Sequence, residues 1–313
     1  YDFYYGGDAE SWTKFAYGLK ARYTLRLIER SSNKVADYAK IIEYADASFS
    51  SAAEQASMSY DDGNNMNPVF DFEYSRDGIS ACTSMHETLS KRNDPRLTRP
   101  YVDPYYGLPL SAEEATLAPT GNPEESQYVY SYPYFIFGVL APVHLLSYHE
   151  VLFIKAEAQV RLGRLDDAKE TLKAAVEAGI ENYEISLEAA VLGYGIEPFE
   201  SDPLTADDAD AYFEEEVEPL FDANPLKEVL MQKYIAFWGE NGESVETYND
   251  IRRIKAEGKG AEIYDNLINT GQFPLRAPYG NDDVVSNPNI TKLYTDAGNY
   301  VFTENVWWAG GSR

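Results

Sequence analysis

Residues 147–180 read SYHEVLFIKAEAQVRLGRLDDAKETLKAAVEAGI. Apolar residues recur in both halves at spacings of three and four, which predicts two helices that each bury one face. Gly163 can take the left-handed conformation that ends the first helix, and Asp166 and Asp167 suit the positive start of the second. We expect Gly179 to end the second helix. Because the turn between them is short, the two helices should be antiparallel neighbours.

This hairpin has the residue pattern of a tetratricopeptide unit. Ala156, Ala168, Leu172 and Ala175 supply its small, small, large and small residues, of which the small ones let two helix backbones approach closely. One such unit cannot bury its own apolar face. The chain must therefore contain other helical pairs that stack against it.

Two further stretches show the spacing that such neighbours require. They lie at about 9–47 and 227–257, and each contains a turn between two helices. The sequence therefore predicts an all-α fold of tetratricopeptide-like helical hairpins, with long irregular loops that carry the ligand site. No linker or charge block marks a boundary, so we expect one domain over residues 1–313.

The segments between and after the hairpins are irregular or polar. Residues 57–146 are dense in turn residues, with helical spacing only at about 81–91. Residues 185–226 are acidic, which favours a solvated helix and turn with no function of their own. In the tail, residues 258–313, prolines exclude a long helix.

Composition limits the classes of partner. The chain has 313 residues, with 26 Lys and Arg against 52 Asp and Glu, and a formal net charge of −26. This charge argues against binding nucleic acid or an anionic membrane surface. No apolar run is long enough to cross a bilayer, and residues 1–8 lack the pattern of a signal peptide. The single cysteine, Cys82, excludes an internal disulfide and leaves the compartment open.

The sequence contains no pattern typical of catalysis. His86, His144 and His149 are not spaced to place two metal ligands on one helix face, so structural roles are expected. Residues 61–65, DDGNN, carry oxygen ligands without the spacing of a calcium loop, and a plain turn is expected. There is no nucleophile elbow, phosphate-binding loop or dinucleotide fingerprint. We therefore predict a protein that is not an enzyme and that uses no cofactor or metal.

Tyrosines are abundant in the loops. The chain has 26 Tyr, and every second residue from Tyr128 to Tyr134 is Tyr, which suggests a short strand. An aromatic ring can stack on the C–H face of a sugar while Asn and Asp bind its hydroxyls, so loop aromatics suit glycan binding. The alternative is that these rings cover the core. The predicted ligand-binding residues are Tyr105, Tyr106, Tyr128, Tyr130, Tyr132, Asp103 and Asn122.

Six segments in order resemble the SusD/RagB-like surface proteins of Bacteroidota, most closely the SusD-like type two branch. The first resembles the helix that opens the second half of the family sequence, the second its central turn and the third its repeat helix. The others resemble the late helical pair, the segment after it and the end of the family sequence. They are GGDAESWTKFAYGLKARYTLRL (6–27), NDPRL (93–97), LSYHEVLFIKAEAQVRLG (146–163), EVLMQKYIAFWGENGESVETYNDIRR (228–253), FPLRAPYGNDDVVSNPN (273–289) and VWWA (306–309).

The resemblance implies a non-catalytic binding protein for oligosaccharides in polysaccharide utilisation and carbohydrate uptake. It implies delivery of the ligand to a SusC-like TonB-dependent transporter, at the extracellular face of the outer membrane. It also implies a lipoprotein, held to the membrane through an N-terminal lipid anchor that is not present in this chain. Two alternatives stay open: a peptide-binding surface lid of the same architecture, and a tetratricopeptide scaffold for other proteins.

The first helix favours a longer polypeptide. Trp12, Phe15, Leu19 and Tyr23 make one of its faces apolar, whereas the ends of stacked repeats need polar caps. The family resemblance places an earlier portion at that end. We therefore expect residues 1–313 to be the C-terminal part of a longer chain, and to expose an apolar patch when expressed alone.

Overall fold

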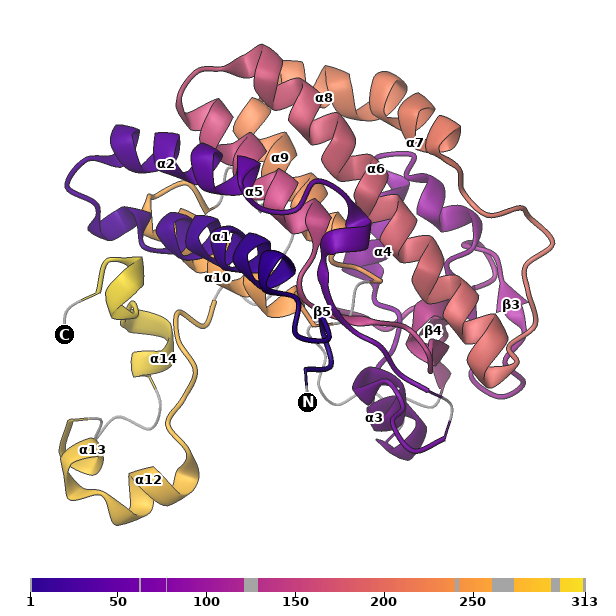
Figure 1. The fold of residues 1–313 in the computed structure, drawn as a ribbon. Coiled ribbons are helices and arrows are strands. Elements are labelled where there is room, and N and C mark those ends of the chain that lie inside the picture. Colours follow the sequence, from indigo (N-terminus) through magenta and orange to yellow (C-terminus); the bar gives the residue numbers. More distant parts are fainter. Residues whose placement is uncertain are drawn as a thin grey trace.

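The computed structural model describes residues 2–61, 63–76, 78–120, 129–239, 242–260, 273–293 and 299–311. Helices dominate these residues and the strands are short, which confirms the predicted all-α fold (Figure 1). The helices are α1 (Ala9–Arg26), α2 (Lys34–Asp46), α3 (Pro68–Arg76), α4 (Thr83–Ser90), α5 (Tyr148–Arg161), α6 (Leu165–Ala189), α7 (Ala206–Tyr212), α8 (Glu218–Ala223), α9 (Pro225–Ala236), α10 (Ser244–Ala256), α12 (Asn281–Ser286), α13 (Pro288–Leu293) and α14 (Tyr300–Thr303). The strands are β1 (Ala56–Met58), β2 (Tyr101–Val102), β3 (Pro109–Leu110), β4 (Tyr132–Pro133) and β5 (Val143–Leu146).

The three predicted hairpins are the pairs α1 and α2, α5 and α6, and α9 and α10. Helix α5 lies at the centre and packs against α1, α2, α6 and α9 (Figure 1). Gly163 has a φ of +75° at the turn after α5, as predicted. Ala156, Ala168, Leu172 and Ala175 are completely buried, so the small residues do lie where helices approach one another.

The second arm of the central hairpin is longer than predicted. Helix α6 continues through Gly179 to Ala189, so the expectation that Gly179 ends it was wrong. A Cβ at Gly179 would stand 3.0 Å from the Cβ of Ala236 on α9. The glycine therefore serves the close crossing of α6 and α9, and packing decides its place in the helix.

The acidic segment after α6 is also more buried than predicted. A π-helical turn (Ala190–Tyr194) follows α6, and a second π-helical segment (Phe213–Val217) joins α7 to α8. One face of α7 and α8 packs into the core beside α6, so this segment is not a solvated helix and turn. Its buried residues are Ala209, Tyr212, Phe213, Val217 and Phe221.

The predicted apolar residues of α1 are divided between the core and the surface. Phe15, Ala21 and Leu25 face the core, whereas Trp12 and Tyr23 are exposed. A side chain at Gly18, on the buried face, would clash with Leu146. The backbone of α1 therefore approaches β5 closely, which turns Trp12 and Tyr23 outward.

The strands position the loops of residues 57–146. Strand β1 pairs with β5, and β2 lies between β3 and β4, all antiparallel. Helix α4 matches the helix predicted at about 81–91. The described helices of the tail are short, as its prolines predict. None of the described helices is long and apolar enough to cross a membrane.

Buried charges connect the helical pairs. Arg22 on α1 forms ion pairs with Glu150 on α5 and, at 2.8 Å, with Glu243 before α10. Lys233 on α9 lies 3.7 Å from Glu150 and 2.7 Å from Asp250 on α10. All five of these residues are buried. The three hairpins therefore meet at matched charges as well as at apolar contacts.

Arg253 on α10 extends this network. Its guanidinium donates two hydrogen bonds of 2.7 Å to the carboxylate of Glu157 on α5 and one of 3.0 Å to Asp250. Two parallel bonds between a guanidinium and a carboxylate fix both groups in direction. Glu157 and Arg253 therefore hold α5 and α10 in one relative orientation.

Candidate functional site

A short hairpin presents two of the predicted tyrosines. The turn between β2 and β3 is closed by the Asp103 N–H, which donates to the Leu108 carbonyl at 2.8 Å. The Asp103 carboxylate accepts the backbone N–H of Tyr105 at 2.9 Å and of Tyr106 at 2.7 Å. Gly107 has a φ of +66°, which completes the turn. The side chains of Tyr105 and Tyr106 are 69% and 81% exposed at the tip.

Tyr130 and Tyr132 point inward. Only 8% of Tyr130 and 5% of Tyr132 is exposed. Tyr132 belongs to β4, which pairs with β2, and its ring packs against Phe137 with the ring centroids 5.7 Å apart. Neither ring offers an open face in this conformation, which corrects the expectation that these tyrosines line the surface. Asn122 and Tyr128 lie outside the described residues.

A second group of aromatic residues lies on α3 and at the end of α6. Tyr194, on the π-helical turn, stacks on Phe137 at 5.6 Å and meets Phe70 of α3 edge-on at 5.0 Å, measured between ring centroids. Tyr74 stacks on Phe70 at 5.7 Å, and both Tyr74 and Tyr194 are exposed. The sequence pattern does not reveal this group, because its members come from three separate segments.

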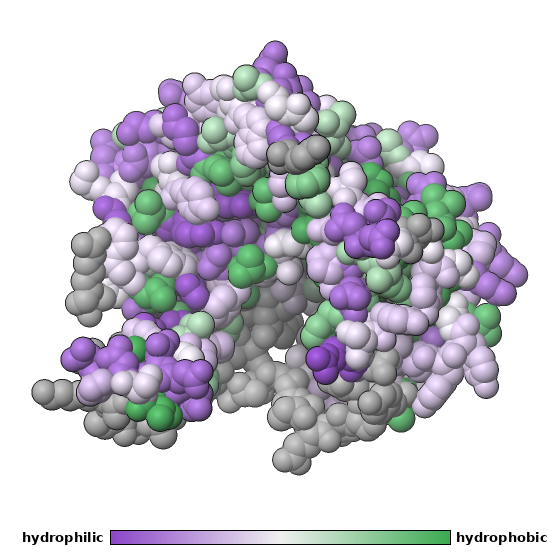
Figure 2. Space-filling view, turned by 60° about the horizontal axis from the view of Figure 1, so that its bottom comes forward, coloured by the Kyte–Doolittle hydropathy of each residue, from purple (hydrophilic) through white to green (hydrophobic). Residues whose placement is uncertain are grey.

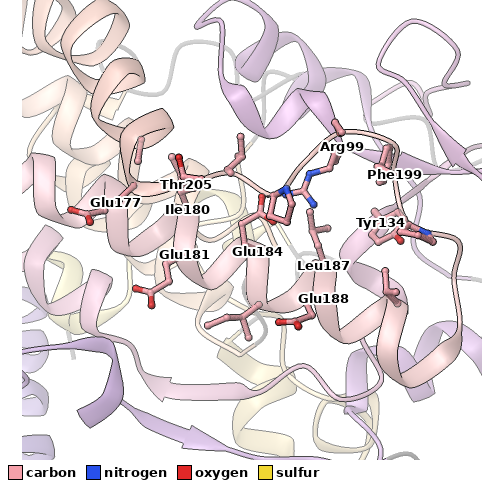
Figure 3. A pocket seen from close by; sticks show the side chains of 18 of the residues that line it. Arg99, Tyr134, Glu177, Ile180, Glu181, Glu184, Leu187, Glu188, Phe199 and Thr205 are labelled. Atoms are coloured by element: carbon pink, nitrogen blue, oxygen red, sulfur yellow. Dashed lines mark ion pairs between the residues drawn. The ribbon is translucent and has the colours of Figure 1, made fainter.

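A groove of about 700 Å³ follows the C-terminal half of α6 (Figure 3). Residues 197–206 form its opposite wall, and they are held by the Tyr134 hydroxyl, which donates to the Glu197 carbonyl at 2.8 Å. Phe199 packs on Tyr134 with the ring centroids 4.8 Å apart. Deep in the groove Arg99 forms an ion pair with Glu184. No function was expected for residues 185–226, which supply much of the groove lining.

The histidines have structural roles, as predicted. The Nδ1 atom of each lies within hydrogen-bond distance of a neighbour: His86 at 3.0 Å from Tyr101 Oη, His144 at 2.6 Å from Ser57 Oγ and His149 at 2.8 Å from Asn182 Nδ2. Burial lowers the pKa of His144 to about 4 and that of His149 to about 3, which favours the neutral ring. Within the described ranges, no three His, Cys, Asp or Glu side chains are grouped to hold a metal ion.

The turn at residues 61–65 is explained by local hydrogen bonds. The Asp61 carboxylate accepts the backbone N–H of Gly63, Asn64 and Asn65 at 2.9–3.1 Å. These bonds hold the pKa of Asp61 below its ordinary value. A carboxylate that accepts bonds from three residues of its own loop is typical of a turn. Asp61, Gly63, Asn64 and Asn65 therefore form the expected turn, and Asp62 lies outside the described residues.

Comparison with known proteins identifies the family. The SusD-like family model, described as "Starch-binding associating with outer membrane", matches residues 1–280. A SusD/RagB family protein from Bacteroides thetaiotaomicron is 46% identical, with a TM-score of 0.91 over 100% of this chain and 67% of that one. A SusD homologue from Bacteroides fragilis is 18% identical, with a TM-score of 0.67 over 98% of this chain and 69% of that one.

A chitin-binding protein also has this fold. It is 21% identical, with a TM-score of 0.63 over 98% of this chain and 66% of that one. The chain thus spans about two thirds of the length of these relatives. The comparison with curated proteins found no match. The family match and the similarity to the Bacteroides thetaiotaomicron protein establish that this chain belongs to the SusD-like family of nutrient-binding proteins that associate with the outer membrane.

Proposed function

We propose that this chain is a non-catalytic binding protein that captures an oligosaccharide at the cell surface. It passes the ligand to a SusC-like TonB-dependent transporter in the outer membrane. The family description, which combines starch binding with the outer membrane, supports this role. The observation that carries the proposal is the β2–β3 hairpin, with two exposed tyrosines at a hydrogen-bonded tip.

The hairpin suits stacking on a sugar because its backbone is fixed before a ligand arrives. Asp103 accepts both tyrosine N–H groups, so the turn loses little conformational freedom on binding. The role of Asp103 in the proposed site is therefore to position Tyr105 and Tyr106. Asn122 and Tyr128 follow this hairpin in the sequence and stay predicted ligand contacts.

One face of the molecule is mixed in polarity (Figure 2). On the face turned forward in Figure 2, hydrophobic residues form small patches among hydrophilic ones. Individual aromatic rings, instead of one broad apolar surface, are the contacts that sugar rings use. The protein described as chitin-binding shares this fold, and its description is in keeping with a carbohydrate ligand for this chain.

Glycan binding can be measured directly. A screen of soluble oligosaccharides against the chain identifies a ligand, and calorimetry then gives its affinity. We expect Tyr105→Ala and Tyr106→Ala each to weaken binding by about 1–2 kcal/mol, because each removes one aromatic contact. Tyr23→Ala is the matched control, since Tyr23 is exposed on α1, far from the hairpin in sequence. Equal affinities of parent, Tyr105→Ala and Tyr106→Ala would place the sugar elsewhere.

Incubation with the bound oligosaccharide tests the non-catalytic role. We expect its chromatographic profile and its reducing ends to stay constant over time. The opposite result would be an accumulation of reducing ends in proportion to the amount of protein. If this activity persisted after repeated purification, the protein would be an enzyme.

A further inference from the structure

The groove along α6 has a surplus of negative charge on its α6 wall. Glu177, Glu181, Glu184 and Glu188 are spaced by four, three and four residues, so they share one face of α6 (Figure 3). No Lys, Arg or His occurs between Lys173 and Lys227 in the sequence, a range that supplies both walls.

Most of these carboxylates have no positive partner. Glu184 pairs with Arg99, but Glu177, Glu181 and Glu188 form no ion pair within the part of the chain that the structure describes. The lysines of α6 lie outside the groove and pair with other acids, as Lys173 does with Asp210 of α7 at 3.2 Å. The groove therefore keeps a surplus of negative charge, which raises the local concentration of cations.

The floor of the groove is aliphatic with one polar pair. Ile180, Leu187, Val191 and Leu204 line it. Arg99 is only 7% exposed, and its Nε–H has no hydrogen-bond partner among the described residues. A buried donor without a partner is costly, so it favours a ligand that brings an acceptor. The floor therefore suits a ligand that has an apolar group next to a hydrogen-bonding group.

The wall opposite α6 is stiff. Pro198 and Pro203 fix the backbone of residues 197–206, and Thr205 caps α7 in a capping box with Asp208. The groove is thus formed before a ligand binds, and its volume lies in the range of small-ligand sites.

From these features we infer that the groove binds a short basic peptide segment with an apolar side chain between its cationic ones. The peptide backbone supplies acceptors for Arg99 and donors for Glu184, its apolar side chain fills the floor, and its Lys or Arg residues reach the glutamates. A neutral sugar would leave the α6 glutamates without cationic partners and would meet an aliphatic floor instead of an open aromatic face. The site is separate from the hairpin of Tyr105 and Tyr106.

Fluorescence anisotropy with three labelled peptides, blocked at both ends, tests the inference. The probes are KLKLK, KSKSK and ELELE. We expect saturable binding of KLKLK, weaker by about tenfold at high salt because exposed charges are screened. KSKSK tests the apolar floor and should bind at least about fivefold more weakly, because it lacks the aliphatic side chains. ELELE should not bind.

Charge variants locate the site. Glu181→Gln/Glu188→Gln should weaken KLKLK binding by about three- to tenfold, as expected for two partly exposed ion pairs. Glu10→Gln/Glu170→Gln is the matched control, since it removes two exposed acids that do not line the groove. Equal weakening by the two double variants would show attraction to the overall charge and would overturn the inference.

A steric block tests the groove itself. Ala206→Trp places a large side chain in the groove, whereas Ala211→Trp places one on an exposed position of the same helix that does not line it. We expect KLKLK binding to be lost only in Ala206→Trp, with oligosaccharide binding unchanged in both. Absence of KLKLK binding to the parent at low salt, or full binding to Ala206→Trp, would refute a peptide site here. Failure of the glycan tests alone would leave these results unaffected.

Discussion

The two helices of the central hairpin use glutamate in opposite ways. On α5, Glu150 and Glu157 are buried and paired with cations from three other helices. On α6, Glu177, Glu181 and Glu188 face a groove and have no ion-pair partner among the described residues. Glutamates therefore connect helices of the fold on α5, whereas on α6 they leave negative charge exposed in the groove.

The difference follows from the elements that face each helix. Helices α1, α9 and α10 bring Arg22, Lys233 and Arg253 to α5, whereas residues 197–206 bring no cation to α6. A buried carboxylate must be paired because its desolvation is costly, but an exposed one stays hydrated without a partner. We therefore expect the glutamates of α5 to affect stability and those of α6 to affect ligand binding. Charge changes on each helix test this difference.

The largest expected effect comes from breaking the network. Arg253→Ala should lower the free energy of unfolding by about 3–5 kcal/mol, because it leaves Glu157 and Asp250 buried beside an empty position. Urea denaturation measures this change. Lys40→Ala is the control, since Lys40 forms an exposed pair with Asp37 at 3.2 Å and should cost less than about 1 kcal/mol. A loss below about 1 kcal/mol for Arg253→Ala would mean that the network does not stabilise the fold.

The second-largest effect on stability should come from acid, which protonates the buried carboxylates of the network. Burial alone would raise the pKa of Glu150, but the charges of Arg22 and Lys233 lower it to about 2. Burial opposes the effect of Arg253 and Arg161 in the same way at Glu157, whose pKa is also lowered to about 2. The pKa values of Glu150 and Glu157 are lower in the folded state than in the unfolded state. The two carboxylates therefore stabilise the fold fully above about pH 4.5, and this stabilisation declines as the pH falls toward 2.

The size of this acid effect follows from the two pKa values. Between pH 7 and pH 3, each carboxylate should lose about 2 kcal/mol of its contribution to stability. Glu157→Gln should start less stable at pH 7 and lose less on acidification, whereas Glu181→Gln should lose as much as the parent. Denaturation at a series of pH values decides this, and identical pH profiles for Glu157→Gln and the parent would contradict it.

The sequence predicts the helical hairpins well because their pattern is local. The spacing of apolar residues and the small residues Ala156, Ala168 and Ala175 are visible within each pair of helices. Gly179 was misjudged because its role depends on Ala236, which belongs to another hairpin. On α1, the burial of Phe15 and the exposure of Trp12 and Tyr23 likewise depend on a contact with β5 that is distant in the sequence.

The candidate site also combines features that the local sequence predicts with features that depend on distant contacts. The turn residues DPYYG, 103–107, identify an exposed aromatic tip from neighbouring residues alone. The alternation of Tyr130 and Tyr132 shows that they share a face but not which face is inward, and the pairing of β4 with β2 settles it. The four glutamates of α6 are visible as one helix face, yet the groove exists only because residues 197–206 fold back over it.

The smallest expected effect is a gain in stability from the groove. Glu181 lies four residues after Glu177 and three before Glu184, and Glu188 lies four after Glu184, so like charges are neighbours along α6. Glu181→Gln/Glu188→Gln should therefore raise the free energy of unfolding by a few tenths of a kcal/mol, roughly the repulsion between such pairs. The same variant should bind KLKLK more weakly, so its effects on stability and binding have opposite signs.

Calorimetry at low and high salt makes this small gain measurable. Repulsion between exposed charges is screened by salt, so the gain should shrink as ionic strength rises. Charge reversal in Glu181→Lys/Glu188→Lys should enlarge the gain to about 1 kcal/mol, because it replaces repulsion with attraction along the helix. A loss of stability in both double variants at low salt would mean that these glutamates stabilise the fold, as Glu150 and Glu157 do, and the contrast between the two helices would not hold.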